Sequence, residues 1–376
     1  MHGARDSLFL LLKTVPRLGG AEIEALMGRF AGPDAFWSAP AFDGCRSGNA
    51  AALEQLRRLG DRSPQWQQVL AWRDGMNRQG IGLVFRDDAT YPPLLREIHQ
   101  PPPALFVRGV AAVLVRPHIA VVGSRNASRA GLSLAADFAA ELAAMGFVIC
   151  SGLALGIDGA AHRSALRAGG CTTAVMGTGL DRIYPAQHGP LALDIAASGA
   201  LVTEFVPGTP PLRGHFPRRN RIIAGLCMGT LVVEAALHSG SLITARLAME
   251  CNREVFAIPG SIHNPRCRGT HALIRQGAKL VETAAHIVEE LPGLLQYHLS
   301  DSQLRPGPAV AAGVDGRPNP AGSARTALEA VDYHPTTLDE VARRSGLPPA
   351  ELAALMLELE LAGWVESVAG AFQRCR

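Results

Sequence analysis

Residues 118–128 read HIAVVGSRNAS, and residues 147–158 read FVICSGLALGID. Each stretch joins an apolar run to a turn that contains glycine and serine, and a helical pattern follows each turn. Short apolar runs without polar alternation are typical of strands buried on both faces, as in parallel sheets that helices cover. The two stretches therefore predict an α/β core with a Rossmann-like sheet, in which ligands bind at the carboxyl ends of the strands.

Further apolar runs extend this pattern along the chain. Residues 128–145, between the first two runs, place apolar side chains three and four positions apart, as a helix does. Strands that alternate with helices favour a mostly parallel sheet covered on both faces, and we assign this core to residues 75–299. The additional runs cover 172–176, 200–203, 230–233, 254–258 and 279–281.

Two further segments surround the core. Residues 1–74 have helical periodicity with a break at Gly19 and Gly20, which predicts a small helical domain of the SAM or helix-hairpin-helix kind. The break either binds a phosphate through backbone N–H groups or is a structural turn. Residues 300–323 are rich in proline, glycine and alanine, so we expect a linker there.

Residues 324–376 predict a winged helix. A capping box at Thr337–Glu340 opens one helix, a second helix covers 348–362, and two short strands follow. From Arg325 onward there are eight acidic and five basic residues, and the second helix contains no basic residue. Because phosphate contacts supply most non-specific affinity for DNA, we expect this unit to contact a protein or the chain's own core.

The composition describes a globular protein without an overall charge signature. Lys plus Arg number 36 and Asp plus Glu 33, so the net charge is +3 and any basic surface must be local. No apolar run approaches the ~20 residues that cross a bilayer, and no cleavable signal sequence follows Met1. We therefore expect a cytoplasmic protein with no membrane partner. Seven scattered cysteines without a C-x-x-C pair argue against a zinc site, and we expect no other metal.

Glycine and serine gather at three predicted strand ends, at 123–124, 151–152 and 239–241. Glycine lets the backbone approach a ligand closely, serine supplies a hydroxyl, and the next helix offers unpaired N–H groups to an anion. The three turns either bind phosphates or are tight turns and helix caps. Asp158 and His162, four apart on one helix, leave open a metal site, an acid–base pair or a brace of the helix.

The segment 208–229 carries four arginines around Phe216 and no acidic residue. A guanidinium binds phosphate as a planar fork, and an aromatic ring stacks on an unpaired base. The segment therefore predicts contact with single-stranded nucleic acid, with a solvated arginine face as the alternative.

No nucleotide or catalytic motif accompanies these residues. The P-loop pattern is missing, and Gly177-Thr178-Gly179 lacks a third glycine at the required spacing. No catalytic set of carboxylates or of Ser, His and Asp stands out, so we expect neither a cofactor nor enzymatic activity. The predicted DNA-binding residues are Gly123, Ser124, Arg125, Ser151, Gly152, Arg213, Phe216, Arg218, Arg219, Asn220, Arg221, Ser239, Gly240 and Ser241.

Several motifs resemble those of the DNA-processing protein A family, DprA or Smf, and they span about Tyr91 to Leu291 in the family's order. They are Tyr91-Pro92 with Leu95, Gly123-Ser124-Arg125, the run 151–158 with His162, Asp181-Arg182-Ile183-Tyr184-Pro185, the run 216–226 (FPRRNRIIAGL), Ser239-Gly240-Ser241-Leu242, and Pro259-Gly260 followed by Gly269-Thr270.

The resemblance implies a bacterial protein that binds single-stranded DNA, protects it and loads a RecA-type recombinase onto it, notably in natural transformation. It implies that residues 123–125 hold the DNA backbone and that Phe216 stacks on a base. Arg213 stands at or near the position of a basic residue that is commonly lysine in the family. The resemblance also implies a homodimer formed through the Rossmann-like domain, without known catalysis.

Two other functions are alternatives. A phosphoribohydrolase of the LOG type would use a P-G-G-x-G-T loop, but Pro259-Gly260-Ser261-Ile262 lacks the second glycine. A winged-helix regulator would bind duplex DNA through residues 348–362, whose glutamates disfavour phosphate. Single-stranded DNA binding fits the motifs better than either alternative.

Overall fold

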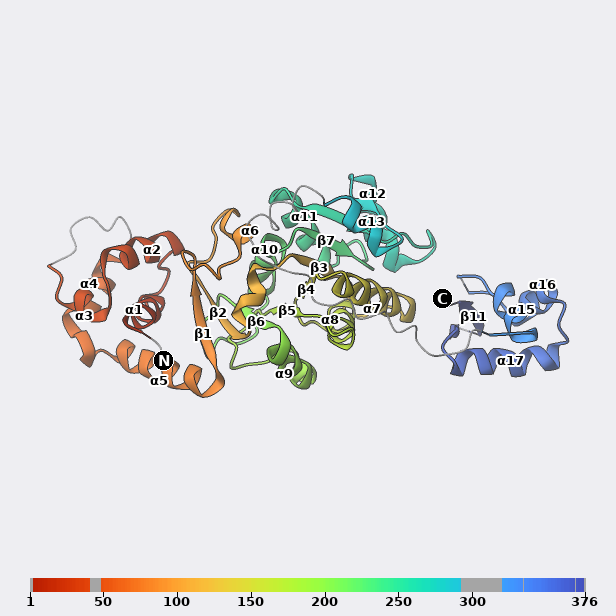
Figure 1. Ribbon diagram of the computed structural model, residues 1–376, viewed down its shortest axis with the longest axis horizontal. Helices are drawn as coiled ribbons and strands as arrows, with labels where there is room; N and C mark the ends of the chain where they lie inside the picture. The colour runs from red at the N-terminus through yellow and green to blue at the C-terminus, as the bar shows by residue number, and fades with distance from the viewer. Residues whose placement is uncertain (1–2, 41–48, 292–319, 334, 369, 375–376) are drawn as a thin grey trace.

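A nine-stranded, mostly parallel sheet forms the centre of the protein (Figure 1). The computed structural model describes residues 3–40, 49–291, 320–333, 335–368 and 370–374. The strand order is β1-β2-β6-β5-β4-β3-β7-β8-β9, with antiparallel pairing only at β1–β2 and β2–β6. The strands are β1 (Ile81–Phe85), β2 (Ala104–Gly109), β3 (His118–Val122), β4 (Val148–Ser151), β5 (Thr172–Val175), β6 (Ala200–Thr203), β7 (Gly229–Val232), β8 (Glu254–Ala257) and β9 (Lys279–Leu280). All seven predicted strands are confirmed to within one residue at either end.

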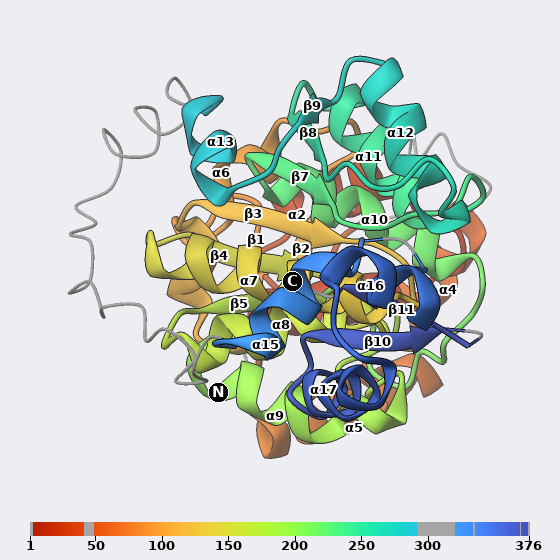
Figure 2. The same cartoon turned by 90° about the vertical axis from the view of Figure 1, so that its right-hand side faces the viewer.

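Helices cover both faces of the sheet (Figure 2). Side chains alternate along each strand, so Ile119 and Val121 of β3 pack with one helical layer, and Ala120 and Val122 pack with the other. One layer contains α7 (Arg129–Ala144), α8 (Ile157–Arg167), α9 (Gly189–Ser198) and α13 (Ala284–Glu289). The other contains α6 (Pro93–Arg96), α10 (His215–Leu226), α11 (Ser241–Glu250) and α12 (Arg268–Arg275). The 3-10 turns are η1 (Gly60–Arg62), η2 (Ala111–Val115), η3 (Ala186–His188) and η4 (Pro265–Cys267).

The chain reverses its winding direction between β3 and β7. It proceeds from β3 through β4 and β5 to β6, and then returns to the other side of β3 for β7. The loops after β3 and β7 therefore diverge and leave a crevice at their carboxyl ends. Gly123 lies at the start of this crevice. No side chain fits at this position, because a Cβ would lie 2.6 Å from Ile157 Cγ1 and 3.0 Å from the Glu234 carbonyl oxygen.

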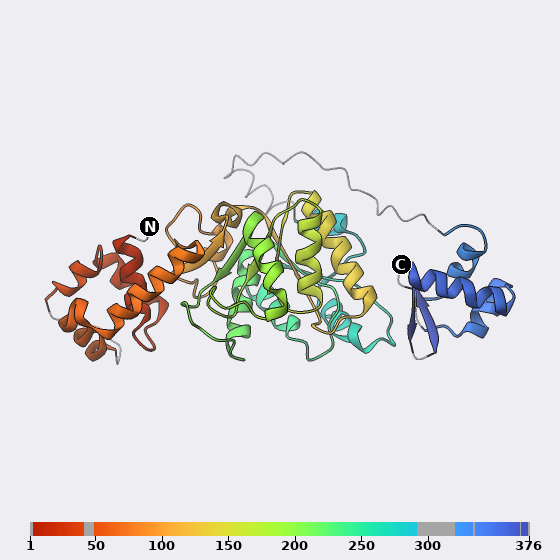
Figure 3. The ribbon, with the colours of Figure 1, turned by 90° about the horizontal axis from the view of Figure 1, so that it is seen from below.

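The N-terminal helices share an apolar core with the edge of the sheet (Figure 3). Phe9 is buried, and its ring lies edge-on to Phe85 of β1, with 5.6 Å between the centroids. In the turn at residues 19–20, the Gly19 N–H donates to the Glu22 carboxylate at 3.0 Å, as in a structural turn. The helices are α1 (Ala4–Lys13), α2 (Gly20–Arg29), α3 (Pro33–Trp37), α4 (Ala50–Leu59) and α5 (Pro64–Gln79), and α5 extends past residue 74.

The C-terminal unit is a winged helix with its own apolar core, which includes Val341, Leu352 and Met356. Thr337 Oγ1 accepts a hydrogen bond from the Glu340 N–H at 3.3 Å and caps the first predicted helix. Of the predicted linker, residues 300–319 lie outside the described residues. No helix in the described ranges is long and apolar enough to cross a membrane. The elements are α15 (Ser323–Ala330), α16 (Leu338–Ser345), α17 (Pro349–Leu361), β10 (Val365–Val368) and β11 (Ala371–Arg374).

Phe9→Ala is expected to lower the free energy of unfolding of the N-terminal helices by about 3–5 kcal/mol, because it leaves a cavity in the shared core. Tryptophan fluorescence during denaturant unfolding reports on this region, since Trp37, Trp66 and Trp72 lie in it. The control Leu193→Ala truncates a side chain that is 57% exposed and is expected to change stability by under about 0.5 kcal/mol. Wild-type stability of Phe9→Ala would contradict a shared core.

Candidate nucleic-acid interface

The crevice between β3 and β7 opens into a cavity of about 790 Å³. Three arginines and one aspartate give its lining a formal charge of +2. The cavity therefore favours an anion. Its polar and charged lining residues are Ser124, Arg125, Asn126, Asp158, Tyr184, Arg213, Arg219, Asn220, Ser239, Ser241 and Thr244.

Two aromatic rings lie beside each other in the cavity wall. The centroids of Tyr184 and Phe216 are 5.7 Å apart, with 46° between the ring planes. The guanidinium carbon of Arg125 lies 5.5 Å from the Phe216 centroid. Phe216 is half-buried in the first turn of α10, whereas Tyr184 is 45% exposed. Neighbouring rings beside a cation suit the stacking of unpaired bases on a chain of phosphates.

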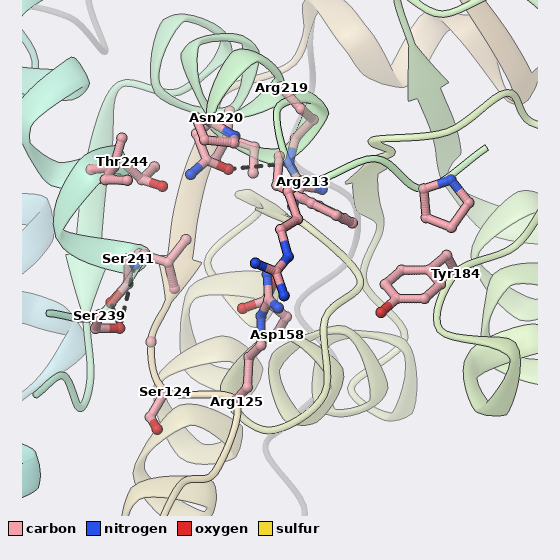
Figure 4. A pocket seen from close by; sticks show the side chains of 18 of the residues that line it. Ser124, Arg125, Asp158, Tyr184, Arg213, Arg219, Asn220, Ser239, Ser241 and Thr244 are labelled. Carbon is pink, nitrogen blue, oxygen red and sulfur yellow. Dashed lines mark hydrogen bonds between the residues drawn. The ribbon is translucent and has the colours of Figure 1, made fainter. Parts of the chain in front are cut away.

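Arg125 and Arg213 are the cations that the cavity offers to a ligand. Both are exposed, and neither forms an ion pair within the described part of the chain. In Figure 4 their side chains extend toward each other, with Tyr184 on one side and Ser239 and Ser241 on the other. The two serine hydroxyls lie 2.7 Å apart at the start of α11. The start of α11 lines the cavity, so the positive end of the helix dipole lies there. Among the described residues, no carboxylate accepts a hydrogen bond from the first turn of this helix.

Arg219 is a structural residue of the cavity floor. It is 5% exposed, and Nη1 donates to the carbonyl oxygens of Gly152, at 2.8 Å, and Val175. Burial lowers the pKa of Arg219 to about 10, and the Asp158 carboxylate opposes this effect. Burial also raises the pKa of Asp158, against the Arg219 charge and the N–H groups of Gly152 and Ala154. The two opposite charges are therefore buried near each other without a direct ion pair, and their hydrogen bonds to the backbone support the loop after β4.

Arg218 and Arg221 are tied to Glu204, which directly follows β6 and is buried. Arg218 Nε donates to Glu204 Oε1 at 3.0 Å, and Arg221 Nη2 donates to Oε2 at 2.6 Å. Arg221 Nη1 also donates to the Gln100 carbonyl oxygen at 2.7 Å. The arginine-rich segment thus obtains a carboxylate from outside its own sequence, so two of its four arginines are paired within the protein.

Two of the three predicted anion-binding turns hold carboxylates of the protein itself. At the start of α7, Glu234 accepts hydrogen bonds from the Ser128 N–H at 2.8 Å and from Ser128 Oγ at 3.0 Å. At the start of α8, Asp158 occupies the turn, and Ser151 Oγ donates inward to the Val121 carbonyl oxygen at 2.7 Å. Within the described residues, the turn at 239–241 binds no carboxylate of the protein, although the N–H groups of Leu242 and Ile243 donate to the carbonyl oxygens of Ser239 and Gly240 at 3.1 and 3.2 Å.

The structure brings ten of the fourteen predicted DNA-binding residues to the cavity. They are Gly123, Ser124, Arg125, Arg213, Phe216, Arg219, Asn220, Ser239, Gly240 and Ser241. Ser151, Gly152, Arg218 and Arg221 do not line it. The sequence interpretation missed Tyr184 as a cavity residue, although an aromatic residue shortly after the strand 172–175 is a signal for this edge of the sheet.

His162 braces its helix against the sheet. Thr172 Oγ1 donates to the Ile149 carbonyl oxygen, so it accepts from His162 Nδ1, at 2.6 Å. Burial lowers the pKa of His162 to about 3, which keeps the imidazole neutral. In the described ranges, no cluster of three His, Cys, Asp or Glu side chains is arranged to hold a metal ion. The sequence left open a metal site, an acid–base pair or a brace of the helix, and these contacts fit the last of the three.

The fold and the cavity define a class: a Rossmann-like protein with an arginine-lined cavity at the switch point of its sheet. Residues 82–292 match the DNA recombination-mediator protein A family, and residues 315–371 match the DprA winged helix domain.

Curated relatives and solved structures agree with this match. Protein Smf of Escherichia coli is 44% identical over 311 residues, which cover 82% of this chain and 81% of that protein. DNA processing protein DprA of Streptococcus pneumoniae is 48% identical over 207 residues, or 54% of this chain and 72% of that protein.

The X-ray structure of the Streptococcus pneumoniae protein matches with a TM-score of 0.59 and 37% identity, over 76% of this chain and 93% of that one. A structure of DNA processing protein A from Helicobacter pylori, described for its single-stranded DNA binding mode, has a TM-score of 0.52 and 28% identity, over 58% and 96%. The chain belongs to the DprA/Smf family.

Asp158→Asn is expected to lower the free energy of unfolding by about 1–3 kcal/mol, because it removes a buried negative charge that offsets Arg219 and weakens the acceptor of the Gly152 and Ala154 N–H groups. The change keeps the side-chain shape, so the loss reports on charge. Glu250→Gln on α11 is the control, since this exposed carboxylate is expected to contribute under about 0.5 kcal/mol. Denaturant unfolding measures both variants, and equal stability of the two would contradict a stabilising role of the Asp158 charge.

Proposed function

We propose that the protein binds single-stranded DNA in the cavity between β3 and β7. The observation that carries this proposal is the pair of unpaired arginines, Arg125 and Arg213, beside Phe216 and Tyr184. The arginines bind successive phosphates, and the rings accept bases that a duplex would keep stacked inside. The relative from Helicobacter pylori, which binds single-stranded DNA, supports the same assignment by kinship.

The finer role follows from the family. We propose that the protein protects incoming or exposed single strands in the cytoplasm and loads a RecA-type recombinase onto them during natural transformation. A homodimer formed through the Rossmann-like domain would place two such cavities on one assembly and raise avidity. We propose no catalysis, because strand binding of this kind needs no reacting group.

The winged helix fits a contact with protein better than a contact with duplex DNA. Its helix α17 has Glu351 and Glu358 exposed and contains no basic residue. A recognition helix in the major groove faces a high density of phosphates, which repel carboxylates. We therefore assign DNA binding to the core domain.

Titration of the full chain against a fluorescent oligonucleotide and its matching duplex, at two salt concentrations and without nucleotide, tests the proposal. We expect a salt-sensitive preference for the single strand. Equal binding of both forms would contradict it. In a separate incubation with nucleoside monophosphates, release of free base would favour the enzymatic alternative.

Arg125→Gln and Arg213→Gln are each expected to weaken binding to every single-stranded sequence. Each change is also expected to reduce the slope of log K against log salt by about 0.7, the value for one lost phosphate contact. Arg218→Gln is the matched control: it removes an arginine five residues away that Glu204 already pairs, and Arg221 still holds Glu204. Equal losses in Arg213→Gln and Arg218→Gln would show that the ion pairs do not decide which arginines bind.

Phe216→Ala is expected to weaken single-strand binding by about 1–3 kcal/mol while leaving the salt slope nearly unchanged, because stacking releases no counterions. The measurement is the same titration at several salt concentrations. Tyr333→Ala is the control, since this aromatic side chain is 60% exposed and does not line the cavity. A changed slope with unchanged affinity at low salt would argue against stacking on Phe216.

A further inference from the structure

A second cavity, of about 610 Å³, lies between the N-terminal helices and the loop that follows β6. Its walls are the end of α1, one face of α5 and residues 206–209. It shares no lining residue with the cavity between β3 and β7.

Lys13 supplies the cation of this second cavity. Its ammonium forms no ion pair within the described part of the chain. Burial lowers the pKa of Lys13, and the Glu204 carboxylate, which already accepts hydrogen bonds from Arg218 and Arg221, opposes this effect. The Glu204 carboxylate is therefore already paired with two arginines and does not form an ion pair with Lys13. Because an unpaired charge is costly to bury, an anion from outside would be a favourable partner for Lys13.

A second carboxylate near the loop is engaged as well. Asp181 accepts a hydrogen bond from the Gly208 N–H at 2.9 Å and lies 3.9 Å from Arg182. It therefore does not supply the missing partner of Lys13.

Trp72 gives the second cavity an aromatic wall. The side chain is half-buried against the N-terminal core and still lines the cavity. Gln65 and Gln68 precede it by seven and four residues, so all three lie on one face of α5. These groups suit single-stranded nucleic acid. A cation binds a phosphate, an aromatic ring stacks on the face of a base, and amides form hydrogen bonds with the edge of a base.

The two cavities adjoin along a single loop. Thr209 lines the second cavity and Pro211 lines the first. An extended chain spans at most about 3.6 Å per residue, so these walls approach to within about 7 Å. The Gly179 N–H donates to the Thr209 carbonyl oxygen at 3.1 Å and holds the loop on the carboxyl edge of the sheet. A ligand that leaves the first cavity past Pro211 therefore meets the second.

We propose that the second cavity holds further nucleotides of the same single strand, with a phosphate on Lys13 and a base stacked on Trp72. This inference rests on the proposed function and extends it, because it makes the N-terminal helices part of the DNA-binding surface. A strand long enough to reach both cavities would gain contacts that a short one lacks.

The test compares a short oligothymidine of about 6 nucleotides with one of about 30. In the full chain, Lys13→Gln is expected to weaken binding of the long strand about fivefold and to reduce its salt slope by about 0.7, while the short strand binds as to wild type. Trp72→Leu is expected to weaken the long strand about fivefold without changing the slope. Lys279→Gln is the matched control, since Lys279 pairs with Glu290 at 3.2 Å and lines neither cavity.

Lysine acylation of the wild-type protein gives an independent readout that needs no variant. Lys13 and Lys279 are the only lysines in the sequence, so mass spectrometry resolves both sites. We expect the long strand to reduce modification of Lys13 at least threefold, and the short strand to leave it unchanged. Unchanged labelling of Lys13 by the long strand, or wild-type binding of both lengths to Lys13→Gln, would overturn the proposal.

The outcomes also separate this inference from the proposed function. If Arg125→Gln and Arg213→Gln weaken binding but Lys13 responds to neither test, the proposal for the second cavity is wrong, and the proposal for the first is retained. If the two arginine variants bind both lengths as wild type does, the proposed function fails, and the second cavity loses its basis with it.

Discussion

Three buried carboxylates at the carboxyl edge of the sheet determine which cations remain for a ligand. A carboxylate away from water needs hydrogen bonds or a counter-ion, so each of the three interacts with nearby donors of the protein. Glu234 accepts hydrogen bonds at the start of α7, and Asp158 accepts them from the loop after β4. Glu204 forms ion pairs with Arg218 and Arg221. The cavity keeps two arginines and the start of α11, arranged around the crevice where the winding of the sheet reverses.

This arrangement explains how one arginine-rich segment performs two tasks. Its first part, with Arg213 and Phe216, faces the cavity, whereas its later arginines hold α10 to β6 and to the floor of the cavity. Base stacking and phosphate contacts are both tolerant of sequence, because every base has a flat face and every nucleotide carries the same charge. Under the proposed function, this tolerance suits the binding of strands of unrelated sequence.

The sequence predicted the sheet well because strands buried on both faces are continuous apolar runs, and this signal is local. It predicted the cavity only in part. Glu204 follows β6, just before the arginine-rich segment, so its pairing with Arg218 depends on how α10 folds back onto the sheet and not on a sequence spacing. The contact of Phe9 with β1 and the place of Tyr184 depend likewise on elements that are distant in the chain.

The account depends most on single-stranded DNA lying in the cavity between β3 and β7. Photo-crosslinking with a halogenated oligothymidine, followed by peptide mapping, tests this location most directly. The account predicts crosslinks to Tyr184 and Phe216, which vanish when unlabelled single strand competes and persist when duplex competes. Crosslinks confined to residues 320–374, in the winged helix, would contradict it.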